Sequence, residues 1–232
     1  MVETKIPEQI VMSHGTTLYR TRPEIDLARL QASFNFVPHD NYWEKGSRYR
    51  TTSRVEITKD GLRLMKKRPL YQPSYVNKLN NYGSLDREYD NAPRSLVESQ
   101  AFADLIESWI SRIPVPVETF SVHQIRTTDN ACPTPEGRHI DGTDWSGVYI
   151  LKRYNISPES AKSTFWDKND NIIMQEVVEE GELLTFFDSN YSHATSNLRK
   201  VIEDEPSYRD VFVLTIPEHG VNHEQEAARA LK

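Results

Sequence analysis

The sequence has a single cysteine, Cys132, and only 9 glycines among its 232 residues. One cysteine excludes an internal disulfide framework and any metal site built from several cysteines. Scarce glycine, together with the lack of a Walker or dinucleotide-binding fingerprint, argues against a phosphate-binding loop. No apolar run approaches the roughly 18 residues that a membrane span requires. The first residues also lack the apolar core of a secretory signal. We therefore expect a cytoplasmic protein without a membrane partner.

Charge is distributed unevenly along this acidic chain. The formal net charge of −6 argues against a protein that binds nucleic acid over its whole surface. Between Lys45 and Arg68, however, nine lysines and arginines accompany only two acidic residues. This basic segment includes Arg48, Arg50 and Arg54. It is compatible with a solvated face, with the anion-binding wall of an active site, or with a local nucleic-acid patch.

The first half of the chain contains the strongest helix signals. Residues 21–24 read Thr-Arg-Pro-Glu, which has the form of a capping box with proline in the first turn. Apolar residues follow at roughly helical spacing up to Phe34. A second helix is predicted from near Pro93 to Ile110, where apolar residues recur at intervals of three and four. Between the two helices, residues 71–91 are predicted to form loops and short edge strands.

After Pro116 the pattern changes to short runs rich in β-branched and aromatic residues, which predict strands. The runs cover residues 117–125, 146–152, 163–166, 172–178, 182–187 and 210–216. No long helices alternate with them, so an antiparallel sandwich or barrel is favoured. We expect an α+β, mainly β fold in a single catalytic domain over residues 1–232. An N-terminal helical and substrate-side region (1–115) would pack on a β core (116–217), followed by a C-terminal tail (218–232).

The first chemical candidate is the triplet His139-Ile140-Asp141. Side chains two apart on a strand point to the same face, so His139 and Asp141 can reach one metal ion. A chain of this composition is expected to contain about one such triplet by chance, so the motif alone is weak. His193 lies just beyond the predicted strand 182–187. As a third ligand it would complete a facial triad of two histidines and one carboxylate, the arrangement of non-haem Fe(II) oxygenases.

Two further strands carry polar residues where a core strand would be apolar. Arg209 opens the last predicted strand, and an arginine in a core strand is costly unless it meets an anion. Its planar guanidinium suits a carboxylate bidentately; the alternative is a structural ion pair with Asp210 or Glu205. Upstream, His123-Gln124-Ile125-Arg126 places polar residues at alternate positions, as expected if one face of the strand lines a polar cavity.

The order of these features resembles the 2-oxoglutarate- and Fe(II)-dependent dioxygenases. The resemblance is closest to the small bacterial and fungal branch that hydroxylates free amino acids such as isoleucine. The matching segments are the strand 123–126, the motif 139–142, the strand and histidine at 186–193, the strand start 208–211, and the basic segment 48–54.

This resemblance implies a double-stranded β-helix (jelly-roll or cupin-like) core with N-terminal helices packed on it. It implies His139, Asp141 and His193 as Fe(II) ligands, and Arg209 as the partner of the distal carboxylate of 2-oxoglutarate. Gln124 is expected beside the cosubstrate. Arg126, Arg48 and Arg50 are expected to bind the carboxylate of a small-molecule amino acid substrate.

The implied reaction consumes Fe(II)-bound 2-oxoglutarate and O2, releases succinate and CO2, and hydroxylates an unactivated C–H bond. Because position 141 holds a carboxylate, no coordination position opens for a halide, and hydroxylation is favoured over halogenation.

Three alternatives stay open at this point. The same fold can act on a peptide, a protein side chain, a nucleobase or another small metabolite. A non-oxidative metal cupin is a second alternative, although cupins usually present more histidines. A non-enzymatic β-sandwich binding module is the third, and it leaves Arg209 unexplained. The sequence does not identify the amino acid or the oxidised carbon, and it leaves a homo-oligomer open.

Overall fold

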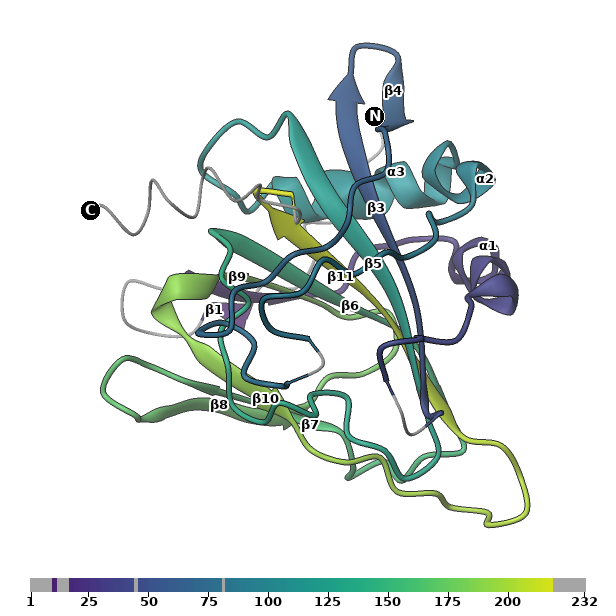
Figure 1. The fold of residues 1–232 in the computed structure, drawn as a ribbon, viewed down its shortest axis with the longest axis vertical. Helices are drawn as coiled ribbons and strands as arrows, with labels where there is room; N and C mark the ends of the chain where they lie inside the picture. Colours follow the sequence, from purple (N-terminus) through teal and green to yellow (C-terminus); the bar gives the residue numbers. More distant parts are fainter. Residues whose placement is uncertain (1–9, 12–16, 44–45, 81, 219–232) are drawn as a thin grey trace.

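A computed structural model describes residues 10–11, 17–43, 46–80 and 82–218. In it, two antiparallel sheets face one another, and the helices cover the outer face of the larger sheet (Figure 1). The N-terminal residues examined for a secretory signal and the predicted tail beyond Glu218 lie outside the described residues. Within the described part, no helix is long and apolar enough to cross a membrane.

The larger sheet has eight strands in the order β1-β2-β9-β6-β11-β5-β3-β4, and the smaller has three in the order β10-β7-β8. The strands are β1 (Ile10–Val11), β2 (Leu18–Thr21), β3 (Arg48–Thr58), β4 (Gly61–Leu64), β5 (Thr119–Thr128), β6 (Trp145–Tyr154), β7 (Lys162–Trp166), β8 (Ile172–Val177), β9 (Leu183–Phe187), β10 (Ser192–Thr195) and β11 (Tyr208–Ile216). The helices are α1 (Leu27–Ala32), α2 (Arg94–Val97) and α3 (Gln100–Ile110), with 3-10 turns η1 (Ser33–Phe36) and η2 (Asp188–Asn190).

All six runs predicted as strands after Pro116 form strands, and the predicted mainly β, jelly-roll fold with helices packed outside is confirmed. The short apolar runs become strands because each lies between turn-forming residues and presents one face to a core.

The N-terminal region contributes more to the large sheet than predicted. Residues 48–58 form β3, which pairs with β5 along its length, and β1, β2 and β4 join the same sheet. Residues 1–115 were expected to form a helical and substrate-side region packed on a β core over 116–217, whereas strands from this region belong to the large sheet itself. Arginines at alternate positions hid the strand, because charged residues suggest a solvent-exposed segment, whereas Arg48, Arg50 and Arg54 are all buried.

The first helix begins later than the sequence suggested, and the second is divided in two. Thr21 ends β2, and α1 is capped instead by Asp26, whose carboxylate accepts a hydrogen bond from the Arg29 N–H at 3.3 Å. The predicted helix 93–110 is divided into α2 and α3. The division falls where the Ser99 hydroxyl caps α3 by accepting from the Phe102 N–H at 3.2 Å.

Strict alternation along the central strands builds a core on each face of the large sheet. Phe212 and Leu214 of β11 pack with the helices, whereas Val211 packs toward the smaller sheet. The helical layer sits very close at Gly147 of β6, where an added Cβ would lie 2.5 Å from the indole nitrogen of Trp109. Because the helices pack on the outer face of the large sheet, the site lies on its other face, between the two sheets.

Candidate metal centre

The two sheets bring His139, Asp141 and His193 together. His139 and Asp141 lie in the loop between β5 and β6, and His193 lies on β10 of the smaller sheet. Although residues 139–141 form no named strand, an isolated antiparallel bridge joins His139 to His193. The His139 N–H donates to the His193 carbonyl at 3.0 Å, and the His193 N–H donates back at 2.8 Å. This pair of backbone bonds fixes the two histidines side by side.

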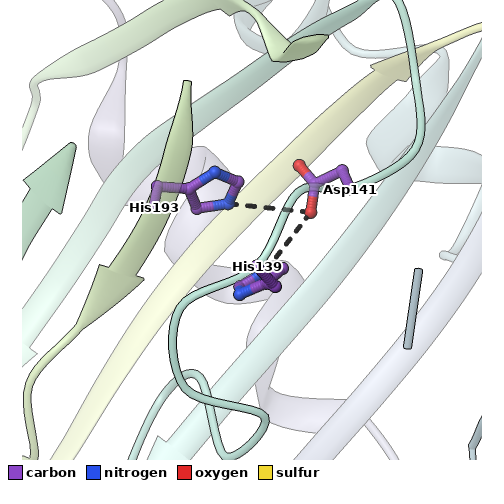
Figure 2. A group of neighbouring side chains, drawn as sticks. All are labelled: His139, Asp141 and His193. Carbon is purple, nitrogen blue, oxygen red and sulfur yellow. Dashed lines mark ion pairs between the residues drawn. The ribbon is translucent and has the colours of Figure 1, made fainter. Parts of the chain in front are cut away.

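The three side chains point at a common point (Figure 2). Oδ1 of Asp141 lies 3.5 Å from Nε2 of His139 and 3.7 Å from Nε2 of His193. The ligand atoms of all three residues lie within 4.8 Å of one another. These separations suit donors that surround a single ion at about 2.0–2.2 Å each.

Each ligand is oriented by a second contact. The His139 Nδ1 lies 2.8 Å from the Gly137 carbonyl, which sets the proton on Nδ1 and leaves the Nε2 lone pair for a metal. The His193 ring stacks on Phe165 at 5.4 Å between centroids. The Ser146 hydroxyl donates to Oδ2 of Asp141 at 2.8 Å, so Oδ1 is the oxygen that faces the histidines.

Electrostatics couple the three groups in the absence of a cation. Burial lowers the pKa of His193 to about 4, against the opposing charge of Asp141. Burial also acts to lower the pKa of His139, but the Asp141 hydrogen bond and the charges of Glu136 and Asp141 outweigh it and raise that pKa to about 9. For Asp141, burial is outweighed by both histidines and Ser146, so its pKa lies well below the usual range.

The donor set fits a ferrous ion. Two neutral imidazoles and one carboxylate on one side of a common point form the facial triad, which leaves positions open for other ligands. Among the described residues, no other group of three or more histidine, cysteine or acidic side chains gathers in this way.

The candidate metal ligands line a cavity of about 100 Å³ between the sheets. Its floor is formed by alternate residues of β3, β5 and β11. One row across these strands consists of Arg48, Thr127 and Arg209, which are paired in register. In the next row, Arg50 of β3 is paired with Ile125 of β5. The cavity is therefore built by the alternation of the strands, and three guanidinium groups line it.

Comparison with known proteins places this site in a family. A family model described as 2OG-Fe dioxygenase matches residues 31–215. The chain belongs to this family. The dioxygenase is thus an oxygenase that uses Fe(II), 2-oxoglutarate and O2, as the sequence predicted, and its His-Asp-His group is the candidate iron site.

Solved structures share the fold of this dioxygenase. A bsmA homologue from Methylobium petroleophilum is 19% identical with a TM-score of 0.68, covering 84% of each chain. IDO from Bacillus thuringiensis is 14% identical with a TM-score of 0.63, over 82% of this chain and 81% of that one. The Fe(II)/α-ketoglutarate-dependent dioxygenase TqaL is 17% identical with a TM-score of 0.61, over 82% of this chain and 73% of that one. No curated protein matches the sequence.

Arg209 of the dioxygenase points into the cavity from β11 and is 4% exposed. Its Nε has no hydrogen-bond partner within the described residues, and no carboxylate among them lies within 4.0 Å of its guanidinium. The predicted alternative partners are engaged elsewhere: Asp210 binds Arg126, and Glu205 accepts from the Tyr154 hydroxyl at 3.4 Å. Burial, and then the charge of Arg153, lower the pKa of Arg209 to about 9. An anionic ligand would supply the missing partner.

Gln124 and Arg126 do not line the cavity, and this expectation is corrected. Their side chains lie on the opposite face of β5. The Gln124 amide donates to the Ser33 hydroxyl at 2.8 Å and accepts from Thr51 at 3.0 Å. Arg126 makes two 2.7 Å hydrogen bonds to Asp210. The sequence suggested that one face of this strand carries polar residues, whereas both faces do. The face that lines the cavity is the one with His123, Ile125 and Thr127.

Arg48 and Arg50 do line the cavity, each buried and each with an Nε that has no hydrogen-bond partner within the described residues. Arg48 donates to the Pro133 carbonyl at 3.2 Å and lies 3.8 Å from Asp40. Arg50 lies 3.1 Å from Nδ1 of His123 and packs over the Tyr89 ring. Arg54, on the same face of β3, lies outside this cavity and pairs with Glu218 at 2.7 Å.

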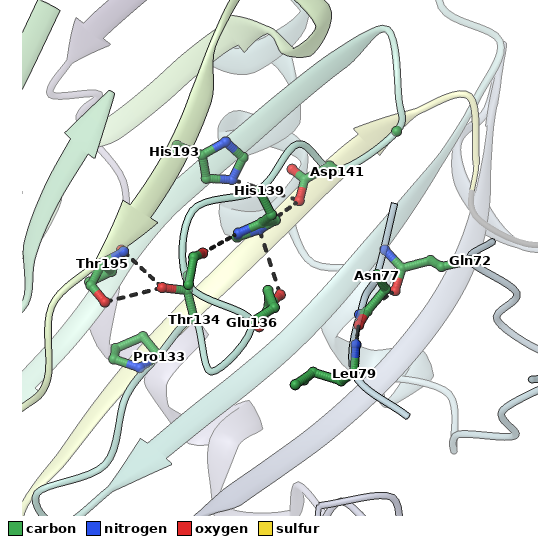
Figure 3. A network of polar contacts seen from close by, with 12 residues as sticks. Gln72, Asn77, Leu79, Pro133, Thr134, Glu136, His139, Asp141, His193 and Thr195 are labelled. Atoms are coloured by element: carbon green, nitrogen blue, oxygen red, sulfur yellow. Dashed lines mark hydrogen bonds and ion pairs between the residues drawn. The ribbon is translucent and has the colours of Figure 1, made fainter. Parts of the chain in front are cut away.

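The sequence did not point to Glu136 or Asp188. Glu136 lines the cavity, with Oε1 3.6 Å from Nε2 of His139 (Figure 3). Asp188 follows β9 and accepts hydrogen bonds from the backbone of residues 141–143. Glu136 lies in a loop and Asp188 begins η2, and among 34 acidic residues nothing in their spacing distinguishes them.

Proposed function

We propose that this dioxygenase hydroxylates an unactivated C–H bond of a free L-amino acid, with release of succinate and CO2. His139, Asp141 and His193 would hold Fe(II), which when bound supplies the O2 chemistry that the side chains lack. The chain's own contributions are ligand orientation, anion binding and exclusion of bulk water from the cavity.

The observation that carries the proposal is the excess of buried positive charge in the cavity. Arg209, Arg48 and Arg50 are each at most 8% exposed, and each has an Nε without a hydrogen-bond partner among the described residues. Of the three, Arg48 alone has a described carboxylate within 4.0 Å, that of Asp40 at 3.8 Å. Buried guanidinium groups in this state are costly unless they meet anions. We assign the distal carboxylate of 2-oxoglutarate to Arg209. Arg48 and Arg50, both on β3 and two strands away from β11 in the sheet, remain for a carboxylate on the substrate.

The resemblance of segments 48–54, 123–126 and 208–211 to the free-amino-acid hydroxylases supports this substrate class. A cavity with two separate cationic regions also suits a small carboxylate better than a peptide segment or a nucleobase. Family membership favours an enzyme over the non-enzymatic binding module. The cytoplasmic location expected from the sequence is kept as part of this proposal.

A succinate-release screen tests the proposal. The protein is supplied with Fe(II), 2-oxoglutarate and O2, and the common L-amino acids are added one at a time. We expect one or a few of them to stimulate succinate release well above the rate without substrate, with a hydroxylated amino acid detected by mass spectrometry. Asp141→Ala abolishes both products, whereas the matched control Asp144→Ala, at an exposed position three residues away, retains them. Stimulation by peptides or nucleobases alone would redirect the proposal to those substrates.

A further inference from the structure

Glu136 is a carboxylate in the cavity that the chemistry described so far leaves without a role. It lies three residues before His139, in the turn closed by a hydrogen bond from the Gly137 N–H to the Thr134 carbonyl at 2.9 Å. Its side chain is 14% exposed. It lines both the inner cavity and an adjoining groove that opens past Tyr75 and Ile140. Glu136 therefore stands at the junction between the metal centre and the outside.

The turn that carries Glu136 is held in place from two sides. The Thr134 hydroxyl donates to the Thr195 carbonyl at 3.1 Å and accepts from the Thr195 N–H at 2.9 Å, which fastens the turn to β10 (Figure 3). Arg48 donates to the carbonyl of Pro133 on the same turn. The backbone beside Glu136 is thus held to β10 through Thr134 and to the Arg48 guanidinium through Pro133.

Within the described residues, His139 is the one cationic group within 4.0 Å of this carboxylate, and the exposed Lys78, which also lines the outer groove, forms no ion pair with it. The contact joins Oε1 of Glu136 to Nε2 of His139, the nitrogen that faces the candidate metal position. A histidine that ligates a metal through Nε2 has no proton there to donate. Arg138, which also lines the outer groove, is committed to Asp170 and to the face of Trp166. With His139 on a metal, Glu136 is a mostly buried carboxylate without a cation.

We propose that Glu136 binds the α-ammonium group of the substrate, opposite Arg48 and Arg50, which bind its α-carboxylate. This inference rests on the proposed function. The proposed substrates are thereby narrowed from small carboxylates to α-amino acids. One carboxylate and two guanidinium groups that line the same cavity would contact the two charged groups of such a substrate. Glu136 is a specificity residue in this scheme. It selects amino acids against carboxylic acids of the same carbon skeleton, because an unpaired buried carboxylate penalises a ligand that lacks the ammonium.

Binding to protein loaded with Mn(II) and 2-oxoglutarate tests this without turnover. The ligands are the amino acid with the highest succinate release in the screen and its des-amino analogue, for example L-isoleucine and 3-methylpentanoate. For the wild-type protein, calorimetry should give a Kd about tenfold or more lower for the amino acid than for the analogue. Equal affinities overturn the proposal, and this measurement needs no variant.

Glu136→Gln then tests the residue itself, with Glu107→Gln, an exposed position on α3, as the matched loss of one carboxylate. Glu136→Gln should raise the Kd of the amino acid about tenfold or more while changing that of the analogue less than about twofold. Glu107→Gln should change neither. Unaltered amino acid affinity in Glu136→Gln overturns the inference, and so does a loss of bound Mn(II), which would assign Glu136 to the metal instead.

The two proposals fail in different ways. If no amino acid stimulates succinate release from the wild-type protein, the proposed function fails and this inference falls with it. If an amino acid is turned over, but Glu136→Gln binds it as tightly as the wild type does, the ammonium assignment alone is wrong.

Discussion

The Asp188 carboxylate holds the backbone of Asp141, the candidate metal ligand. It accepts hydrogen bonds from the N–H groups of Asp141 at 2.9 Å, Gly142 at 2.8 Å and Thr143 at 3.2 Å. Gly142 has a φ of +78°, a conformation that glycine adopts without strain and that turns the three N–H groups toward one point. A residue after β9 thus sets the direction in which the Asp141 side chain leaves the loop.

We predict that Asp188→Asn weakens metal binding without unfolding the protein. An amide presents one acceptor oxygen and a donor NH2 group, so at least one of the three backbone bonds is lost and the Asp141 loop is released. Contacts that orient a metal ligand are typically worth about 10- to 100-fold in metal affinity. Mn(II) titration followed by electron paramagnetic resonance measures the change. Asp167→Asn, which removes an exposed carboxylate that also accepts backbone bonds, is the control. Wild-type affinity in Asp188→Asn would contradict the assignment.

We predict that Arg209 lowers the stability of the ligand-free protein and increases its affinity for 2-oxoglutarate. Replacing it by glutamine removes the guanidinium that we assign to 2-oxoglutarate. The Kd for 2-oxoglutarate should therefore rise about a hundredfold, as for truncation of one partner of a buried charge pair. The same change removes a buried charge that lacks an anion in the free protein, so the Tm without ligand should stay the same or rise.

Calorimetry and thermal denaturation of Arg209→Gln give the two readings, with Arg29→Gln at an exposed position of α1 as the control. In the wild-type protein, saturating 2-oxoglutarate should raise the Tm, and in Arg209→Gln this increase should largely disappear. Undiminished 2-oxoglutarate affinity would assign the distal carboxylate to another residue.

The sequence predicted the strands after Pro116 well, because each is a short apolar run between turn residues. It predicted the grouping of His139, Asp141 and His193 only with the help of a family pattern, since the histidine–acid triplet is expected by chance. The sequence could not show which face of a strand lines the cavity when both faces carry polar residues. In β5, Gln124 binds Ser33 beneath the helices while Ile125 faces the cavity.

A second limit concerns contacts between segments distant in the chain. Asp188, at the end of β9, binds residues 141–143 in the loop before β6, and no local pattern in the sequence encodes that contact. Likewise, the sequence left the basic segment with Arg48 and Arg50 open between a solvated face, an anion-binding wall and a nucleic-acid patch. Their burial follows from the pairing of β3 with β5, which places alternate residues of both strands over one cavity.

Arg126 provides a direct test of the corrected face of β5. Its guanidinium makes paired bonds to Asp210, whose side chain is 3% exposed, and lies over the Tyr208 ring. Arg126→Ala leaves a buried carboxylate unpaired and should lower the free energy of unfolding by about 3 kcal/mol. Substrate KM should not change, because the side chain lies outside the cavity.

Arg50→Ala is the matched comparison, since it removes an arginine that faces the cavity two strand positions from Arg48. Here substrate KM should rise about tenfold or more while bound metal is unchanged. Urea denaturation and steady-state kinetics of the two variants separate the roles. A rise in KM for Arg126→Ala without loss of stability would restore the original assignment of that residue to the substrate.

Metal affinity should increase with pH across the neutral range, because the metal displaces a proton from His139. In the metal-free protein the pKa of His139 is raised to about 9, so this ring is protonated at neutral pH, whereas the pKa of His193 is lowered to about 4 and its ring is already neutral. A metal displaces the proton of His139 and none from His193. The affinity for Mn(II) should therefore rise about tenfold per pH unit between about pH 6 and 8, and level off above the His139 pKa.

Calorimetric titrations in buffers of different ionisation enthalpy count the released protons directly. A pH-independent affinity would contradict the assignment of the displaced proton to His139. Asp188 is a second source of protons in this range, because burial and then the charge of Asp141 raise its pKa to about 7.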